Sequence, residues 1–181
     1  MNPQETLVYK TLPLMAEIYD DINGLTLDEA RKLLRESSGD DWINSTVEAV
    51  GREKLMNDRP SWYFAFVKGE EGDIGNDNMS ELVSKYMKHE HAIMEIAMYI
   101  ALNRTNMYHY ILSTKLEYDL VEGFIQVDET QYPINTNYID EKLKDNSDNE
   151  EQLKVYFENI GQARENLLII GKQVKKELER R

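Results

Sequence analysis

The stretch MKHEHAIMEIAMYIALNR, residues 87 to 104, decides how the rest of the chain must be arranged. Between Ala92 and Leu102 every residue is apolar except Glu95. A helix that is apolar on every face has to be surrounded by other elements. We therefore expect this segment to be the central core helix, as part of a helix from about Met79 to Asn103 that Ser80 caps.

Two histidines and two glutamates at the start of this segment raise the question of a metal site. On a helix His91 and Glu95 share a face, whereas His89 and His91 point about 200° apart. The zinc pattern of two histidines four residues apart is absent, and so is the Glu-x-x-His motif of helical di-iron sites. We interpret these residues as structural or exposed. The alternative is a metal-dependent enzyme that uses His91, Glu95 and His109, which only the fold can bring together.

Glu95 needs a hydrogen-bond or ion-pair partner if the core helix is buried. A carboxylate buried alone costs several kcal/mol or becomes protonated. We expect its partner to be His91, Arg104 or a tyrosine hydroxyl.

Further helices are predicted on the N-terminal side of this segment. Apolar residues at helical spacing indicate a helix over residues 4–22, with a kink or break at Pro13. Thr26 and Glu29 form a capping box that begins a second helix.

Two more segments have helical patterns. Asp40 or Asp41 can cap a third helix over residues 42–56. Residues 106–122 are ambiguous between strand and helix, and their apolar spacing of three and four, with Gly123 at the end, favours a helix.

A small β element is expected beside the helices. In SWYFAFVKG the large aromatic residues alternate with other side chains, which is typical of a half-buried strand. The best pairing partner for residues 61–68 is the segment 123–128, which is rich in strand-forming residues.

The C-terminal part predicts one long helix over residues 147–179, which begins at a capping box of Ser147 and Glu150. Its apolar residues repeat at four and three, with Arg164 and Gly171 interrupting the pattern. The pattern fits an ordinary long core helix or a helix that self-associates into a homodimer. The candidate self-association residues are Leu153, Phe157, Ile160, Leu167, Val174 and Leu178.

The chain is strongly acidic, with 34 acidic and 21 basic residues, a net charge of -13 and a pI near 4.7. This excess disfavours direct contact with nucleic acid or an anionic membrane, because such contacts depend on Lys and Arg. It suits solubility, or a surface that engages a basic protein. The candidate partner-binding residues are Glu70, Glu71, Asp73, Asp77, Asp140, Glu141, Asp145 and Asp148. Their spacing in residues 69–78 does not fit an EF-hand loop.

Several enzyme classes lack their signatures. With no cysteine there is no thiolate zinc site, iron–sulfur cluster or cysteine nucleophile, and no phosphate-binding loop or Gly-x-Ser-x-Gly motif occurs. The N-terminus does not resemble a signal peptide, and no apolar run is long enough to span a bilayer, so a cytoplasmic location is expected. Trp42, Trp62, Tyr63, Tyr108 and Tyr110 are either core or interface residues.

The sequence thus predicts a mainly α, bundle-like single domain over residues 1–181, without a cofactor. Its expected function is non-catalytic binding of another protein, as a regulator or inhibitor. A partner with a basic, nucleic-acid-binding surface would be held by charge mimicry.

Overall fold

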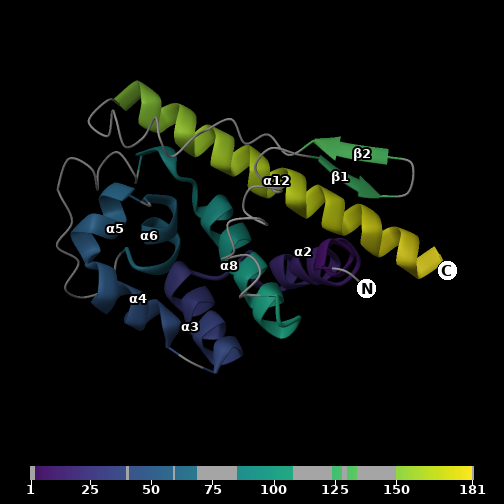
Figure 1. Ribbon diagram of the computed structural model, residues 1–181, viewed down its shortest axis with the longest axis horizontal. Coiled ribbons are helices and arrows are strands. Elements are labelled where there is room, and N and C mark those ends of the chain that lie inside the picture. The colour runs from purple at the N-terminus through teal and green to yellow at the C-terminus, as the bar shows by residue number, and fades with distance from the viewer. Residues whose placement is uncertain are drawn as a thin grey trace.

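The computed structural model describes residues 3–39, 41–58, 60–68, 85–107, 124–127, 130–133 and 150–180. Most of these residues are helical, which confirms the mainly α fold (Figure 1). The helices are α1 (Pro3–Thr6), the π-helical turn η1 (Leu7–Thr11), α2 (Leu12–Ile22), α3 (Leu27–Ser38), α4 (Trp42–Val50), α5 (Arg52–Asp58), α6 (Pro60–Phe66), α8 (His89–Arg104) and α12 (Glu150–Arg180). The strands are β1 (Phe124–Val127) and β2 (Thr130–Pro133).

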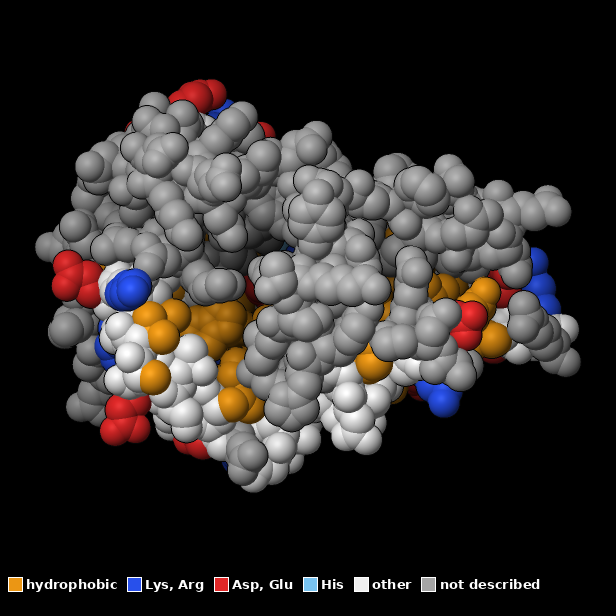
Figure 2. Space-filling view, in the orientation of Figure 1, with side chains coloured by type: hydrophobic (Ala, Val, Ile, Leu, Met, Phe, Trp, Pro, Cys, Tyr) orange, Lys and Arg blue, Asp and Glu red, His pale blue; other side chains and the backbone are white. Residues whose placement is uncertain are grey.

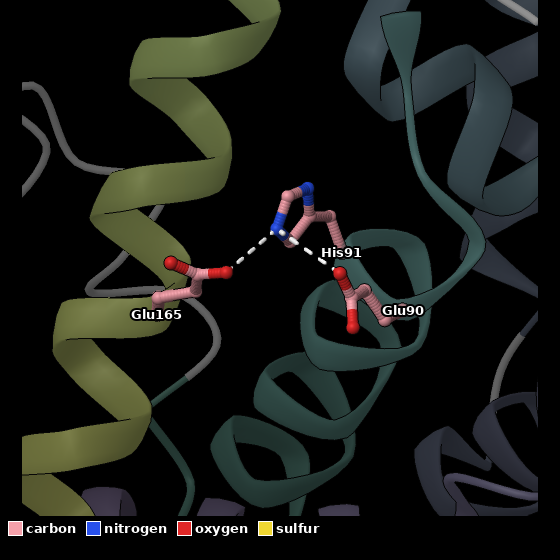
Figure 3. A group of neighbouring side chains, drawn as sticks. All are labelled: Glu90, His91 and Glu165. Carbon is pink, nitrogen blue, oxygen red and sulfur yellow. Dashed lines mark hydrogen bonds and ion pairs between the residues drawn. The ribbon is translucent and has the colours of Figure 1, made fainter.

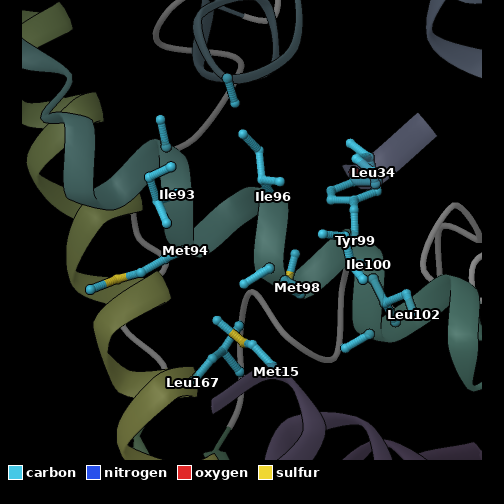
Figure 4. Packing of buried hydrophobic residues seen from close by; sticks show 14 of the residues in the cluster. Met15, Leu34, Ile93, Met94, Ile96, Met98, Tyr99, Ile100, Leu102 and Leu167 are labelled. Carbon is cyan, nitrogen blue, oxygen red and sulfur yellow. The ribbon is translucent and has the colours of Figure 1, made fainter. Parts of the chain in front are cut away.

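Helix α8 is the centre of the fold, as predicted. All twelve residues from His91 to Leu102 are buried, and α2, α3, α6 and α12 pack around them. Figure 4 shows apolar side chains of α8 meeting Leu34, Met15 and Leu167 from three other helices. The buried apolar residues form one cluster between Leu7 and Val174. One continuous core is consistent with a single domain, and the extent of that domain over residues 1–181 stays a prediction.

The start of α8 differs from the prediction. The helix begins at His89, because Lys88 has the extended backbone of an N-cap (φ -85°, ψ 146°). A continuous helix from Met79 is therefore wrong, and Ser80 lies outside the described residues.

The N-terminal helix is interrupted where Pro13 requires it. Pro13 has no N–H for an α-helical bond to the carbonyl of Tyr9, and its ring disfavours the preceding turn. The chain forms the π-helical turn η1 instead, in which the Leu12 N–H donates to the Leu7 carbonyl. The sequence predicted a kink or a break, and the structure has this π-helical turn within a continuous helical run from Pro3 to Ile22.

Capping residues start the next two helices as predicted. The Thr26 side chain accepts from the Glu29 N–H and the Glu29 side chain bonds back to Thr26, so the capping box is present. The Asp41 side chain accepts from the Asn44 N–H at the start of α4. The third helix is not continuous: Gly51 has φ 98° and separates α4 from α5.

Residues 61–68 do not form the predicted strand. They belong largely to helix α6, which Pro60 starts at its first position, where a missing N–H costs nothing. Trp62 and Phe66 are four residues apart and contact each other edge to face at 5.2 Å. The spacing that looked like strand alternation therefore also places both rings on one face of a helix.

The segment 123–128 is confirmed as a strand over Phe124–Val127, but its predicted partner is wrong. Strand β1 pairs antiparallel with β2, and the register runs from Phe124 opposite Pro133 to Val127 opposite Thr130. The hairpin lies beside α12 (Figure 1). The predicted helix over residues 106–122 lies outside the described residues.

The long C-terminal helix is confirmed as α12, with 31 residues. It packs against α2, η1 and α8. Its first turn is tied to the chain before α8, because the Glu150 carboxylate accepts hydrogen bonds from Lys85 Nζ at 2.8 Å and from the Tyr86 hydroxyl at 2.6 Å. The hydrogen bond to Lys85 holds the pKa of Glu150 below its usual value. Ser147 lies outside the described residues.

None of the helices in the described part of the chain combines the length and the apolar character needed to cross a membrane.

Candidate functional site

Buried polar side chains gather where α8 and α12 face each other. From α8 come His91 and Glu95, one turn apart, and both are buried. From α12 come Gly161, Arg164 and Glu165, at the same spacing of three and four residues that brings helical side chains onto one face. This polar layer lies inside an otherwise apolar helix packing.

Glu95 is buried, as predicted, and Arg164, which the sequence did not suggest, is one of its partners. Its side chain is 4% exposed and its Oε1 accepts a hydrogen bond from Arg164 Nη2 at 3.2 Å. Arg164 also contacts the sulfur of Met98, one turn further along α8. Arg164, which interrupts the apolar pattern of the C-terminal helix, therefore neutralises the buried carboxylate of the core helix.

His91 lies between two carboxylates. Its Nε2 is 3.1 Å from Glu165 Oε1 on α12 and 4.0 Å from Glu90 Oε1 on its own helix. Figure 3 shows both carboxylates directed at this one ring nitrogen. The His91 side chain is 10% exposed, whereas both carboxylates reach solvent.

Gly161 makes room for the imidazole. A Cβ atom at this position would lie 2.6 Å from Cε1 and 2.7 Å from Nδ1 of His91, well inside van der Waals contact. The ring therefore rests directly against the backbone of α12. Only glycine allows this approach without a shift of the ring.

The pKa of Tyr19 on α2 is affected by the carboxylates around His91. Its partial burial raises the pKa of the phenol, and the negative charges of Glu90, Asp20 and Glu165 raise it further. Two of these three carboxylates are those that flank His91. Three helices thus meet at a negatively charged edge of the polar layer.

The predicted metal set is not assembled in the described residues. His91 and Glu95 share a face of α8, but they bond to different residues of α12. His109 lies outside the described residues. His89 points elsewhere, with its Nε2 3.1 Å from the Leu25 carbonyl.

The predicted partner-binding residues all lie outside the described residues, so their positions stay a prediction. They are Glu70, Glu71, Asp73, Asp77, Asp140, Glu141, Asp145 and Asp148.

The predicted self-association residues divide into three groups. Phe157, Leu167 and Val174 are buried inside the chain itself, and Leu178 is 39% exposed. The side chains of Leu153 and Ile160 are outside the described set. The buried residues favour the core-helix interpretation, and a homodimer stays a prediction.

The aromatic residues that the structure describes are in or against the core. Trp42 stacks on Tyr99 at 5.6 Å and contacts Trp62 edge to face at 6.2 Å, and Tyr63 is fully buried. Tyr108 and Tyr110 lie outside the described residues.

Sequence reasoning missed the contributions of Arg164, Glu165 and Gly161. A usable signal was present: a glycine in a helix interior costs about 1 kcal/mol relative to alanine, so its presence indicates a close contact. An arginine in an apolar stripe likewise indicates a buried acid opposite.

The fold and the site together define a mainly α protein whose central helix is joined to its C-terminal helix by a buried ion pair and a carboxylate–histidine–carboxylate cluster. No protein-family model, no curated protein and no solved structure matches the chain.

Proposed function

We propose that this chain is a non-catalytic protein-binding protein, a regulator or inhibitor that acts on a partner with a basic surface. The partner's basic surface binds nucleic acid when free, and the acidic chain takes the place of the phosphates. The proposal extends to a cytoplasmic location, where such partners occur.

The negative charge of the whole sequence, with 34 acidic and 21 basic residues, carries this proposal. The described acidic side chains are exposed except for Glu95, Glu165 and Glu177. On the face shown in Figure 2, acidic and basic side chains are both scattered over the described surface. The net negative charge of the chain attracts a cationic partner and speeds its association.

The competing hypothesis, a metal-dependent enzyme that uses His91, Glu95 and His109, has less support. A catalytic carboxylate must be free to bind a metal or a proton of the substrate. The Glu95 carboxylate instead accepts a hydrogen bond from Arg164 within a packed helix interface. This arrangement suits a structural role for Glu95.

The proposal is tested by partner capture with charge-neutralised variants. One variant changes Glu70, Glu71, Asp73 and Asp77 to the corresponding amides, and a second does the same for Asp140, Glu141, Asp145 and Asp148. We expect each to retain less of a basic protein that the wild-type chain captures stoichiometrically, because each loses four negative charges from one segment.

The matched control neutralises four exposed glutamates on described helices: Glu17, Glu36, Glu48 and Glu53. It changes the net charge by the same amount and should retain the partner almost fully. Equal retention by all variants, or capture of acidic and basic proteins alike, would contradict the proposal.

A further inference from the structure

The cluster of Glu90, His91 and Glu165 has the composition and spacing of a metal site that is distinct from the predicted set. One nitrogen and two carboxylate oxygens lie within 4.8 Å of one another. His91 and Glu165 lie on different helices and are 74 residues apart in sequence, so the fold itself brings them together.

The distances fit an ion placed between the three groups. Ligand atoms at about 2.1 Å from a tetrahedral ion are about 3.4 Å from each other. The separations from His91 Nε2, 3.1 Å to Glu165 and 4.0 Å to Glu90, lie on either side of this value. The separations within the cluster reach up to 4.8 Å, so the exposed glutamate side chains must move closer together to bind one ion.

The histidine of the cluster is buried, whereas its two glutamates are exposed to solvent. The His91 ring is held in place by the backbone of α12 at Gly161. The side chains of Glu90 and Glu165 are 54% and 40% exposed. An ion can therefore enter from solvent and keep water as its remaining ligand, while the imidazole is already positioned.

The donor set indicates the class of ion. Imidazole together with carboxylate favours first-row divalent transition metals, whereas Ca²⁺ and Mg²⁺ prefer all-oxygen sites. The two carboxylates balance the charge of one divalent ion. The ion takes the place of the contact between Nε2 and Glu165, and it binds the neutral imidazole whose one ring proton is on Nδ1.

The geometry points to a binding site for one Zn²⁺-class ion formed by Glu90, His91 and Glu165, which joins α8 to α12. The site is independent of whether the acidic segments hold a protein partner.

Calorimetric titration of ZnCl₂ into the chelator-treated, dialysed full-length protein tests this site. We expect one ion per chain, and an affinity lower by tenfold or more in Glu90→Gln and in Glu165→Gln, because an amide is a poor ligand. Both side chains are half-exposed, so the variants keep the fold, as circular dichroism will check. Zn²⁺ should also raise the melting temperature of the wild type, and of the variants much less.

His89→Gln is the matched control, since it removes a histidine two residues away that is outside the cluster. It should bind Zn²⁺ like the wild type. The inference is overturned if the wild type binds no stoichiometric Zn²⁺, or if both glutamine variants bind it with unchanged affinity. An equal loss on His89→Gln would overturn it as well.

Discussion

At the scale of single residues, the ion pair of Glu95 and Arg164 joins the core helix α8 to the C-terminal helix α12. Removing two charges from water is costly, and the mutual attraction offsets this cost only when both partners are present. Glu95 is 3% exposed, and its carboxylate bonds to Arg164 across the helix interface. Loss of one partner therefore removes a charge-assisted hydrogen bond from the helix interface.

Arg164→Met should destabilise the protein by about 3 kcal/mol, because the buried Glu95 carboxylate then loses the guanidinium that offsets its charge. The double variant Glu95→Gln/Arg164→Met should lose less than the sum of the two single variants, with a coupling of about 1 kcal/mol or more. Urea denaturation measures both quantities. Lys154→Met, an exposed change on the same helix, is the control and should have little effect. Additive effects of Glu95→Gln and Arg164→Met would contradict the pairing.

The sequence predicted that Glu95 is buried and paired, but it did not predict the partner. Burial follows from the local run of apolar residues around Glu95, which is visible in eleven positions. The partner is a matter of the fold, because Arg164 is 69 residues away. The expected partners were His91, Arg104 or a tyrosine hydroxyl, and closeness in sequence could not have suggested Arg164.

At the scale of elements, the glycines of α12 set how closely the helices approach. A Cβ at Gly171 would lie 2.1 Å from the Leu12 carbonyl oxygen on α2, a backbone atom that cannot move alone. The three atoms nearest to a Cβ at Gly161 all belong to the His91 side chain rather than to the backbone of a neighbouring helix. Both glycines are on α12, but Gly161 faces a side chain and Gly171 faces the backbone of another helix.

Gly171→Ala should destabilise the protein by about 2 kcal/mol, since overpacking outweighs the gain of about 1 kcal/mol in helix propensity. Gly161→Ala should cost less, and in a His91→Ala background it should become stabilising because the obstacle is gone. Thermal or urea denaturation compares the four variants, with exposed Gln162→Ala as the control. If Gly171→Ala raises stability, the close approach of α12 to Leu12 is wrong.

Element types were predicted well where the signal is local. The capping box at Thr26, the irregular turn before Pro13 and the long helix α12 all depend on neighbouring residues, and all are present. The prediction of a strand over residues 61–68 was wrong because aromatic residues two and four apart fit both the alternation of a strand and the spacing of a helix face. Pro60 at the start of a helix was the overlooked signal.

At the scale of the whole molecule, charge and core are separated. Apolar residues of helices across the chain form one cluster around α8, and the described acidic residues lie outside it with few exceptions. The composition predicted this arrangement, because 41% apolar residues suffice for a core and thirteen excess negative charges must stay in water. The composition does not show which of the acidic segments binds a partner.

The central claim is that the acidic surface holds a basic partner in place of nucleic acid. The most direct measurement is the affinity of the chain for its purified captured partner at low and high salt, with duplex DNA as competitor. We predict that affinity falls steeply with salt, and that DNA displaces the chain. Neutralising Glu70, Glu71, Asp73 and Asp77 together should lower both the affinity and its salt dependence. An affinity that is independent of salt and unaffected by DNA would contradict the claim.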